Sequence, residues 1–592
     1  MKSRTSSFKT ALRKNMTRFA PAWGLYTILL VMVLLTVVSL DNDYWTVRNM
    51  ADFLTAMPVF GLFYALLTAQ LLFGDLFNSR MCNALHAMPL RREGWFGANV
   101  AAGVLFNLIP TLVATLLSLP FCIAAGVIDG WQVPLYWLLG SNLSYLCFFG
   151  IAALCVQLTG NRFAMAVVYG ILNFGAIITY WLVDTIYTPM FYGVRTWEAP
   201  FLRLTPVVHM AEENYVVVTR YNADTIYEYA DMALTGEWYR LVIWAGVGIV
   251  LLGLALLLYR KRHLECAGDF MAFRKMEPAF LLVYTLIAGT CFQFFTSNVI
   301  GGYGDLIYLF FGLAVGWFTG RMLLKRTIRV FQWKAVGGCA LLMAAMGVSL
   351  VVCATDLPGI ASWMPEAGQV KTAYLYLGNA SNHRIPESAA VMESPQDIDL
   401  TLQIHEMSLV PEVVVTDRVI ATAADIDGEY TYTYADTYFS YTIIYELENG
   451  RTVYRYYHAY AAGELGQLLT PVFSRPEVVL GMPEAALDAY ADTVFEVTAD
   501  GWPLNLTDAQ IRSLLDAIVA DCKAGNMVQT RSFHCLDHTS RERFYIDFSS
   551  YGEDRLHFYL SLNVWSCCEN TLRWMDENDM WDKMVEYEEK YG

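Results

Sequence analysis

Nine long, almost wholly apolar stretches alternate with shorter polar segments through the first 353 residues. They lie near residues 22–40, 53–73, 97–128, 133–158, 163–187, 240–259, 279–296, 304–319 and 336–353. A helix needs about 20 apolar residues to cross the roughly 30 Å hydrocarbon core of a bilayer. The pattern therefore predicts a polytopic α-helical membrane protein with about nine transmembrane helices.

Three of these stretches carry further expectations. Pro110 and Pro120 lie inside the third stretch and predict a kink or a break there. The eighth stretch, LIYLFFGLAVGWF, is the shortest and is the weakest candidate for a span. A long basic flank precedes the first stretch and no small-x-small cleavage site follows it, so we expect a retained helix and not a signal peptide.

After residue 354 the pattern changes to short alternating runs. Asn449-Gly450 lies between two such runs and predicts a β-hairpin, and a second hairpin is expected around Tyr551-Gly552. Thr507 and Gln510 have capping-box spacing at the start of a helical pattern. Two further helices are expected over ENTLRWMDEN and DMWDKMVEYEEKYG. These signals predict an α+β domain over 354–592.

The segment 188–239 is too long for a simple connection between two spans. It contains the run TPMFYGVRTWEAPFLRLTPVVHM. Tyr192, Trp197 and Phe201 suit a segment that lies along the membrane surface, because aromatic side chains favour that interface. An ordinary structured loop is the alternative.

The composition changes this picture when it is divided at residue 354. The whole chain has 592 residues, 56% of them hydrophobic and 16% charged, with a net charge of −16. Residues 354–592 hold 15 Lys+Arg and 38 Asp+Glu and carry −23, whereas residues 1–353 carry +7. A disordered chain is excluded by the apolar content, and the acidic balance argues against a nucleic-acid partner.

The basic residues of the membrane half predict its orientation. If the N-terminus is placed inside and the spans alternate, 20 Lys+Arg fall in the inner segments and 5 in the outer ones. Basic residues accumulate in cytoplasmic loops. We therefore expect a multi-pass protein of the plasma membrane with a cytoplasmic N-terminus and an extracellular domain at 354–592.

Motifs that would carry catalysis are missing from the sequence. It has no GxxxxGK[ST] loop, no HExxH and no GxSxG, so we expect no catalytic activity, no metal and no bound cofactor. Four of the 12 cysteines lie beyond residue 354, at 522, 535, 567 and 568. A disulfide between Cys522 and Cys535 is one of three pairings, and free thiols are the alternative.

Polar side chains within the spans are candidates for a substrate path. The residues are Gln70, Asn107, Asn142 and Asn173. The alternative is hydrogen bonding between helices, which membrane bundles use routinely. No run of intramembrane carboxylates is present, which argues against a proton-driven transporter.

The segments predicted to lie inside are the most specific part of the sequence. Phe8, Leu12, Met16 and Phe19 share one face of a basic N-terminal arm, which predicts an amphipathic helix on the inner surface. A short segment, GDLFNSRMCNALHAMPLRREGWFGAN, then connects the second and third stretches.

This connecting segment resembles the permease subunits of bacterial ABC-2 type transporters. In that family a short coupling helix ends in a leucine-rich turn, followed by Pro and Arg, and docks on a cytosolic ATPase. The resemblance implies that role for Arg80, Leu85, Met88, Pro89, Arg91 and Arg92. The sequence Met81-Cys82-Asn83 departs from the glycine-threonine-acid stretch that the family often has at this place.

A second segment, LYRKRHLECAGDF, is similar to the signature that closes the six-span core in a Gram-positive subgroup. The matching residues are Tyr259, Arg260, Arg262, Glu265, Ala267 and Gly268. We expect Glu265 to pair with a nearby arginine, or alternatively with the ATPase. The resemblance implies a permease core over 1–262 and three additional spans over 263–353.

The expected function is therefore that of a transmembrane permease subunit of an ATP-binding cassette exporter. The resemblance implies that a separate ATPase binds the ATP and that the permease pairs with a second permease subunit, either identical or different, among membrane lipids. Its substrate would be an antimicrobial peptide or another amphiphile. The alternative is a membrane-anchored sensor or scaffold whose outer domain binds an extracellular ligand.

Overall fold

The structure is a computed structural model, and its contacts divide the chain into two units. It describes residues 2–37, 43–86, 92–124, 129–194, 198–211, 216–221, 229–234, 238–301, 304–380, 385–386, 388–410, 419–421, 432–434, 438–460, 464–527, 542–551, 557–581 and 584. We call residues 1–186 with 197–348 the helical unit, and residues 187–196 with 349–592 the sheet unit. The division that the sequence predicts at residue 354 lies between residues 348 and 349. Residues 187–196, from the loop after the fifth predicted span, also belong to the sheet unit.

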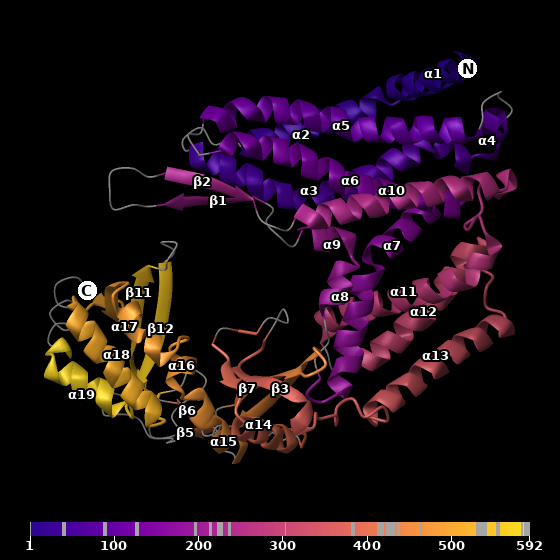
Figure 1. The fold of residues 1–592 in the computed structure, drawn as a ribbon. Coiled ribbons are helices and arrows are strands. Elements are labelled where there is room, and N and C mark those ends of the chain that lie inside the picture. The colour runs from indigo at the N-terminus through magenta and orange to yellow at the C-terminus, as the bar shows by residue number, and fades with distance from the viewer. Residues whose placement is uncertain are drawn as a thin grey trace. The chain divides into compact units, whose positions relative to one another are not determined.

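Long helices make up most of the helical unit, and α3, α5, α6 and α10 pack side by side in it (Figure 1). The long helices are α1 (Lys2–Arg18), α2 (Ala20–Val37), α3 (Asp43–Leu72), α5 (Arg92–Ala124), α6 (Val133–Leu158), α7 (Arg162–Leu182), α10 (Trp238–Lys261), α11 (Glu277–Ile300), α12 (Asp305–Lys325) and α13 (Trp333–Ala354). Within the described residues, eight helices are long and apolar enough to cross a membrane, or nine when the bent pair of α1 and α2 is one span.

Two expectations about single spans are settled by these helices. The weakest candidate is α12, a helix of 21 residues, so this prediction of a long apolar helix is confirmed. Of the predicted kink or break at Pro110 and Pro120, the break is wrong, because α5 continues through both prolines. Proline removes the donor for the carbonyl four residues earlier. For Pro110 that carbonyl belongs to Phe106, and the Tyr64 hydroxyl donates to it at 3.1 Å.

The N-terminal arm forms the expected amphipathic helix and packs on α5. Ala11 clusters with Trp95 and Ala98 of α5. Asn15 Nδ2 donates to Asn99 Oδ1 at 2.7 Å, a contact that is buried. Three members of the predicted apolar face pack against the main core of the helical unit: Leu12, Met16 and Phe19. The axis then bends by 57° into α2.

The outer surfaces of the long helices remain apolar. Val250 of α10 is 70% exposed, Ile307 of α12 is 73% exposed and Val299 of α11 is 83% exposed. Water-facing surfaces rarely display contiguous large apolar side chains, whereas lipid-facing helices do so throughout. These apolar faces are compatible with an integral membrane protein.

The connection between α7 and α10 is divided between the two units. Helices α8 (Glu198–Arg203) and α9 (Pro206–Ala211) belong to the helical unit, as does an antiparallel hairpin of β1 (Val216–Tyr221) and β2 (Tyr229–Leu234). The Phe201 ring contacts the Tyr180 ring of α7 at 5.8 Å between centroids. Tyr192 belongs instead to the sheet unit, and Trp197 lies outside the described residues.

Within its described residues, the sheet unit contains two four-stranded antiparallel sheets, a two-stranded sheet of β5 and β6, and helices, as the predicted α+β domain requires (Figure 1). The sheet of order β4-β3-β7-β8 shares a core with α14 and α15, and the sheet of order β10-β9-β11-β12 shares a core with α18 and α19. The bounds are β3 (Val370–Leu377), β4 (Ala390–Met392), α14 (Pro395–Ser408), β5 (Val419–Ala421), β6 (Tyr432–Tyr434), β7 (Tyr438–Leu447), β8 (Thr452–Tyr460), α15 (Glu464–Phe473), α16 (Pro476–Val479), α17 (Leu487–Ala491), β9 (Val494–Ala499), β10 (Trp502–Pro503), α18 (Asp508–Lys523), β11 (Glu542–Tyr551), β12 (His557–Trp565) and α19 (Glu569–Glu577).

The local signals after residue 354 are confirmed. Strands β7 and β8 form the hairpin at Asn449-Gly450, where Gly450 has a φ of 78°. Strands β11 and β12 form the second hairpin. Thr507 and Gln510 make the predicted capping box of α18. The predicted helix over ENTLRWMDEN is α19, whereas most of the last predicted helix lies outside the described residues.

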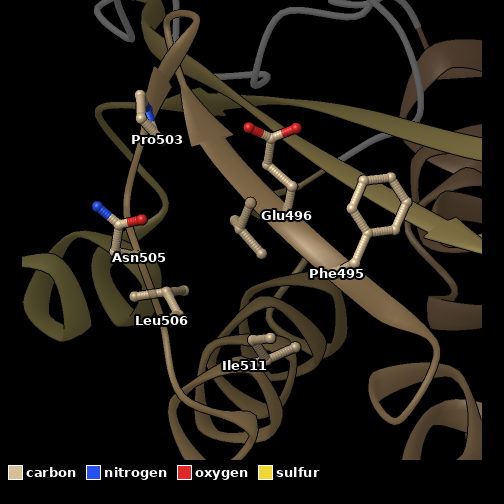
Figure 2. A pocket seen from close by; sticks show the side chains of 7 residues that line it. Phe495, Glu496, Pro503, Asn505, Leu506 and Ile511 are labelled. Atoms are coloured by element: carbon tan, nitrogen blue, oxygen red, sulfur yellow. The ribbon is translucent and has the colours of Figure 1, made fainter. Parts of the chain in front are cut away.

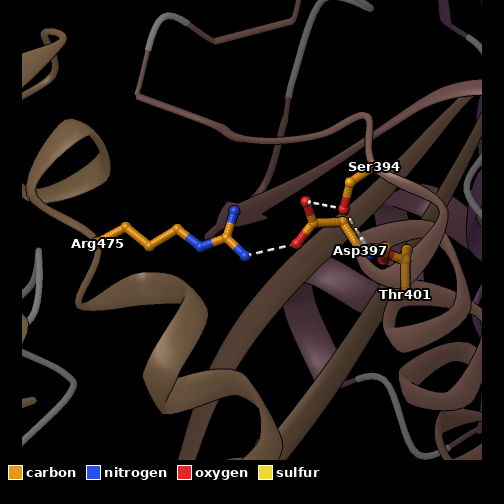
Figure 3. A network of polar contacts seen from close by, with 4 residues as sticks. All are labelled: Ser394, Asp397, Thr401 and Arg475. Atoms are coloured by element: carbon orange, nitrogen blue, oxygen red, sulfur yellow. Dashed lines mark hydrogen bonds and ion pairs between the residues drawn. The ribbon is translucent and has the colours of Figure 1, made fainter.

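An ion pair joins the start of α14 to the turn after α15 (Figure 3). Arg475 Nη2 lies 2.7 Å from Asp397 Oδ1, and Ser394 caps α14 by accepting from the backbone N–H of Asp397. Partial burial alone would raise the pKa of Asp397, but the hydrogen bonds from Arg475 and Ser394 outweigh it and hold the pKa below its usual value. The carboxylate therefore stabilises this junction in its charged form.

The cysteines correct one expectation. Cys522 is a free, buried thiol in α18, so the predicted pairing of Cys522 with Cys535 is wrong. Cys535 lies outside the described residues. Cys567 is disulfide-bonded, whereas its neighbour Cys568 is free and buried. Cys522 lies in the core between α18 and its sheet, where a free thiol packs as a small apolar side chain.

Candidate functional site

The five segments predicted to lie inside meet at one end of the helical unit, which we call the basic end. Arg18 at the end of α1 pairs with Asp75 after α3, with 3.8 Å between Nη1 and Oδ1. Gln70 Nε2 donates to the backbone oxygen of Arg162 at 3.3 Å. Asn161 Nδ2 donates to Asp269 O at 3.2 Å, and Arg326 Nη2 lies 3.7 Å from Asp269 Oδ1. This chain of contacts places all five segments together, as alternating spans require.

A short helix, α4 (Ser79–His86), projects from the basic end at the position of the expected coupling helix. It follows the 3₁₀ turn η1 (Gly74–Phe77). Cys82 is its buried residue, whereas Arg80 is exposed and Met81 is 45% exposed. Leu85 belongs to α4 but its side chain is not described, and Met88, Pro89 and Arg91 lie outside the described residues. Among the α4 side chains that the structure describes, only Cys82 is buried, so the others are available to a partner.

The two segments that resemble permease signatures contact each other. Arg92 begins α5, and its Nη1 lies 3.4 Å from Arg260 O and 3.5 Å from Arg262 O at the end of α10. Glu93 pairs with Arg260, with 3.1 Å between Oε1 and Nη2. The Tyr259 ring stacks on Phe96 with centroids 5.9 Å apart. The carbonyls that end a helix lack partners within the helix, so a cation placed there is favourable.

Arg262 is the buried centre of the basic end, with 4% of its surface exposed. Its guanidinium donates to the Val156 carbonyl in the last turn of α6, and its Nη2 lies 3.4 Å from the Leu76 carbonyl of η1. Asn99 supplies a similar donor to Leu72 O at the end of α3, at 3.0 Å. Arg262 therefore connects α6, α10 and the turn that leads into α4.

The loop after Arg262 is held against the end of α6. Gly268 N donates to Gly160 O at 2.6 Å, and Gly268 has a φ of 99°, which favours glycine. A Cβ atom on Gly160 would lie 2.2 Å from Cys266 O, so the two segments touch through backbone. Glu265, in the turn η5 (Leu264–Cys266), is exposed and has no ion pair within the described residues. The expected local pairing of Glu265 is wrong, because Arg260 pairs with Glu93 instead.

The polar residues proposed for a substrate path divide into separate local contacts. Asn107 Nδ2 donates to Asn142 Oδ1 at 3.1 Å, and Asn142 Nδ2 donates to Thr111 Oγ1 at 3.0 Å, which links α5 to α6. Asn173 is buried and donates to Tyr169 O of its own helix at 2.8 Å. Gln70 takes part in the basic end instead. For Asn107 and Asn142 the structure matches the alternative of hydrogen bonding between helices.

A groove of about 540 Å³ lies in the second sheet of the sheet unit, between β9 and the start of α18 (Figure 2). Glu496 and Phe495 come from β9, Pro503 from β10, and Asn505 and Leu506 from the connection to α18. Glu496 is exposed, and Phe495 is 45% exposed. The groove thus combines an accessible carboxylate with apolar contact area.

The sequence pointed to the basic end but missed how it is assembled. Arg92 and Arg260 are 168 residues apart, and neither Glu93 nor Asp269 was singled out. Both are acidic residues next to basic loops, and that position was the sequence signal for their ion pairs. The chain matches no protein-family model, no curated protein and no solved structure.

Proposed function

We propose that this chain is the membrane-spanning subunit of an ATP-driven exporter of the ABC-2 type. The carrying observation is the contact of Arg92 and Glu93 with Arg260 and Arg262, because it unites the two segments whose sequences resemble that family. The eight or nine long apolar helices within the described residues and the exposed residues of helix α4 support the same interpretation. A separate cytosolic ATPase binds the ATP and docks on α4.

In this proposal the basic end passes a displacement of α4 to the spans. Arg262 ties η1 to the ends of α6 and α10, and Arg92 and Glu93 tie α5 to α10. A partner that pushes α4 therefore moves the inner ends of several helices together. Packed helices move as rigid bodies between discrete arrangements, which is how a bundle alternates between two open states.

The remaining parts of the proposal concern the partners. The protein pairs with a second permease subunit, either a copy of itself or a different chain, and its apolar faces contact lipid. The sheet unit faces the cell exterior, and the carboxylate of Glu496 in the groove is suited to a cationic amphiphile as the exported compound. The chain itself carries out no catalytic step.

A receptor is the second candidate, and the groove beside Glu496 is the observation that favours it. In that case the sheet unit binds an extracellular ligand and no ATPase is needed. The two candidates differ in whether ATP hydrolysis accompanies the purified protein.

The experiment purifies the tagged full-length protein from the membranes of its own organism and measures the ATP hydrolysis that copurifies. We expect activity with the wild-type chain and its loss in R80E, which reverses an exposed charge on α4. R203E is the matched control, because Arg203 is exposed on α8, on the opposite predicted side. Absence of hydrolysis with the wild type, or full activity in R80E, contradicts the proposed docking.

A further inference from the structure

Arg455 of the sheet unit lies where two segments coming from the long helices meet. It belongs to β8, the edge strand of the first sheet. Residues 187–194 follow α7, and the last three of them, Tyr192 to Val194, contact this edge. Val194 forms an antiparallel bridge with Arg455, and Tyr456 N donates to Gly193 O at 3.0 Å. The segment after α7 thus extends the sheet beyond β8.

Gly193 makes this close approach possible. Its φ is +75°, and a Cβ atom there would lie 2.1 Å from the Tyr457 ring. The neighbouring Tyr192 ring contacts Tyr457 with 5.6 Å between centroids. A residue with a side chain at position 193 would have to separate the segment from β8, because both the backbone conformation and the space require glycine.

The guanidinium of Arg455 holds the other segment, which follows α13. Arg455 Nη2 donates to Ile360 O at 2.9 Å and to Trp363 O at 3.2 Å, and the guanidinium lies over the Trp363 ring at 5.7 Å. The Asp356 carboxylate closes this loop by accepting from the N–H groups of Ile360 and Ser362 at 2.7 and 3.0 Å. The hydrogen bonds of Asp356 therefore hold the loop in the conformation that places both carbonyls beside Arg455.

A third contact joins the segment after α7 to the end of α13. The Tyr187 hydroxyl lies 2.8 Å from Ser349 Oγ, which belongs to the last two turns of α13. Arg455 is 5% exposed, so each guanidinium donor that finds an acceptor offsets part of the cost of burying the charge. Nη2 has two acceptors, the carbonyls of Ile360 and Trp363, whereas Nε has no hydrogen-bond partner within the described residues. Removal of the guanidinium leaves both carbonyls without their donor.

We propose that Arg455 is a positioning residue that joins the connections leaving α7 and α13, so that the two move as one body with β8. Its backbone forms the β-bridge to the segment after α7, and its side chain donates hydrogen bonds to the segment after α13. Any displacement that ligand binding or transport produces in one connection is passed to the other through this joint. The inference does not depend on whether the chain is a permease or a receptor.

Hydrogen–deuterium exchange of the full-length protein in lipid nanodiscs tests the joint. We expect R455M to raise the exchange rate at least about tenfold in both 187–194 and 356–363, because charge-assisted hydrogen bonds are lost on one side and the edge strand is disturbed on the other. R451M is the matched control, since Arg451 is exposed in the same hairpin and should leave both segments unchanged. Unchanged exchange in either segment of R455M overturns the proposal.

If R455M destabilises the whole sheet unit, exchange in α18 will also be faster. A second variant then tests the joint. G193A perturbs the joint from the segment after α7 alone. We expect it to raise exchange in 356–363 as well as in 187–194. A rise confined to 187–194 shows that the two connections are independent and overturns the proposal.

Discussion

Replacement of Arg262 by methionine should open the segment that carries α4. Methionine keeps an unbranched apolar stem of similar length but removes the donors to Val156 O and Leu76 O. A hydrogen bond to a charged group contributes about 1.5–3 kcal/mol. The Leu76 contact is long at 3.4 Å, and removal of a buried charge recovers part of the loss. We therefore expect a net cost of about 2 kcal/mol, which is about thirtyfold in the opening equilibrium.

Limited trypsin digestion in nanodiscs measures this opening. Arg80 is exposed, but the peptide bond after it is cleaved only when α4 unfolds locally, so the rate of release of fragment 1–80 follows the open population. R260M is the control, because the Arg260–Glu93 pair has side chains 51% and 47% exposed. Exposed pairs contribute about 0–1 kcal/mol, so R260M should accelerate cleavage less than about fivefold. Equal acceleration by R260M and R262M would refute the central position of Arg262.

Three further predictions concern the sheet unit. His405 is buried between the hydroxyls of Tyr445 and Tyr457, and desolvation, together with Arg455, lowers its pKa to about 4. Between about pH 6.5 and 4, His405 is therefore protonated in the unfolded chain but neutral in the folded one. The thermal unfolding midpoint should fall as the pH falls through this window, and it should fall less in H405Q. After unfolding without reductant, iodoacetamide should label Cys522 and Cys568 but label Cys567 only after reduction, as read by peptide mass spectrometry. G450A should lower the unfolding free energy by about 1 kcal/mol in urea titrations, because Gly450 has a φ of 78°.

Features that depend on neighbouring residues could be predicted from the sequence. Asn449-Gly450 specifies its hairpin through the φ that the turn requires, and Thr507 with Gln510 specifies a helix start through two local hydrogen bonds. Long apolar stretches specify long helices for the same reason, since each backbone bond is satisfied within the segment. These predictions needed no knowledge of distant parts of the chain.

Features that depend on distant partners could not be predicted in this way. Pro110 was expected to kink or break a helix, but α5 continues through it, and Tyr64 satisfies the carbonyl that the proline leaves without a donor. Glu265 was expected to pair with an arginine of its own segment, but Glu93 occupies Arg260. Tyr192 was expected along the membrane surface or in an ordinary structured loop, and its ring contact with Tyr457 had no signal in the sequence. Each of these contacts joins residues that are far apart in the chain.

The central claim is that α4 is the surface on which a nucleotide-binding ATPase docks. A photo-reactive amino acid placed at Met81, which is 45% exposed, tests it in native membranes, with the same substitution at Arg203 as the control. We expect a covalent adduct from position 81 that a radiolabelled azido-ATP also labels, and no such adduct from position 203. No adduct from position 81, or an equal adduct from both positions, would contradict it.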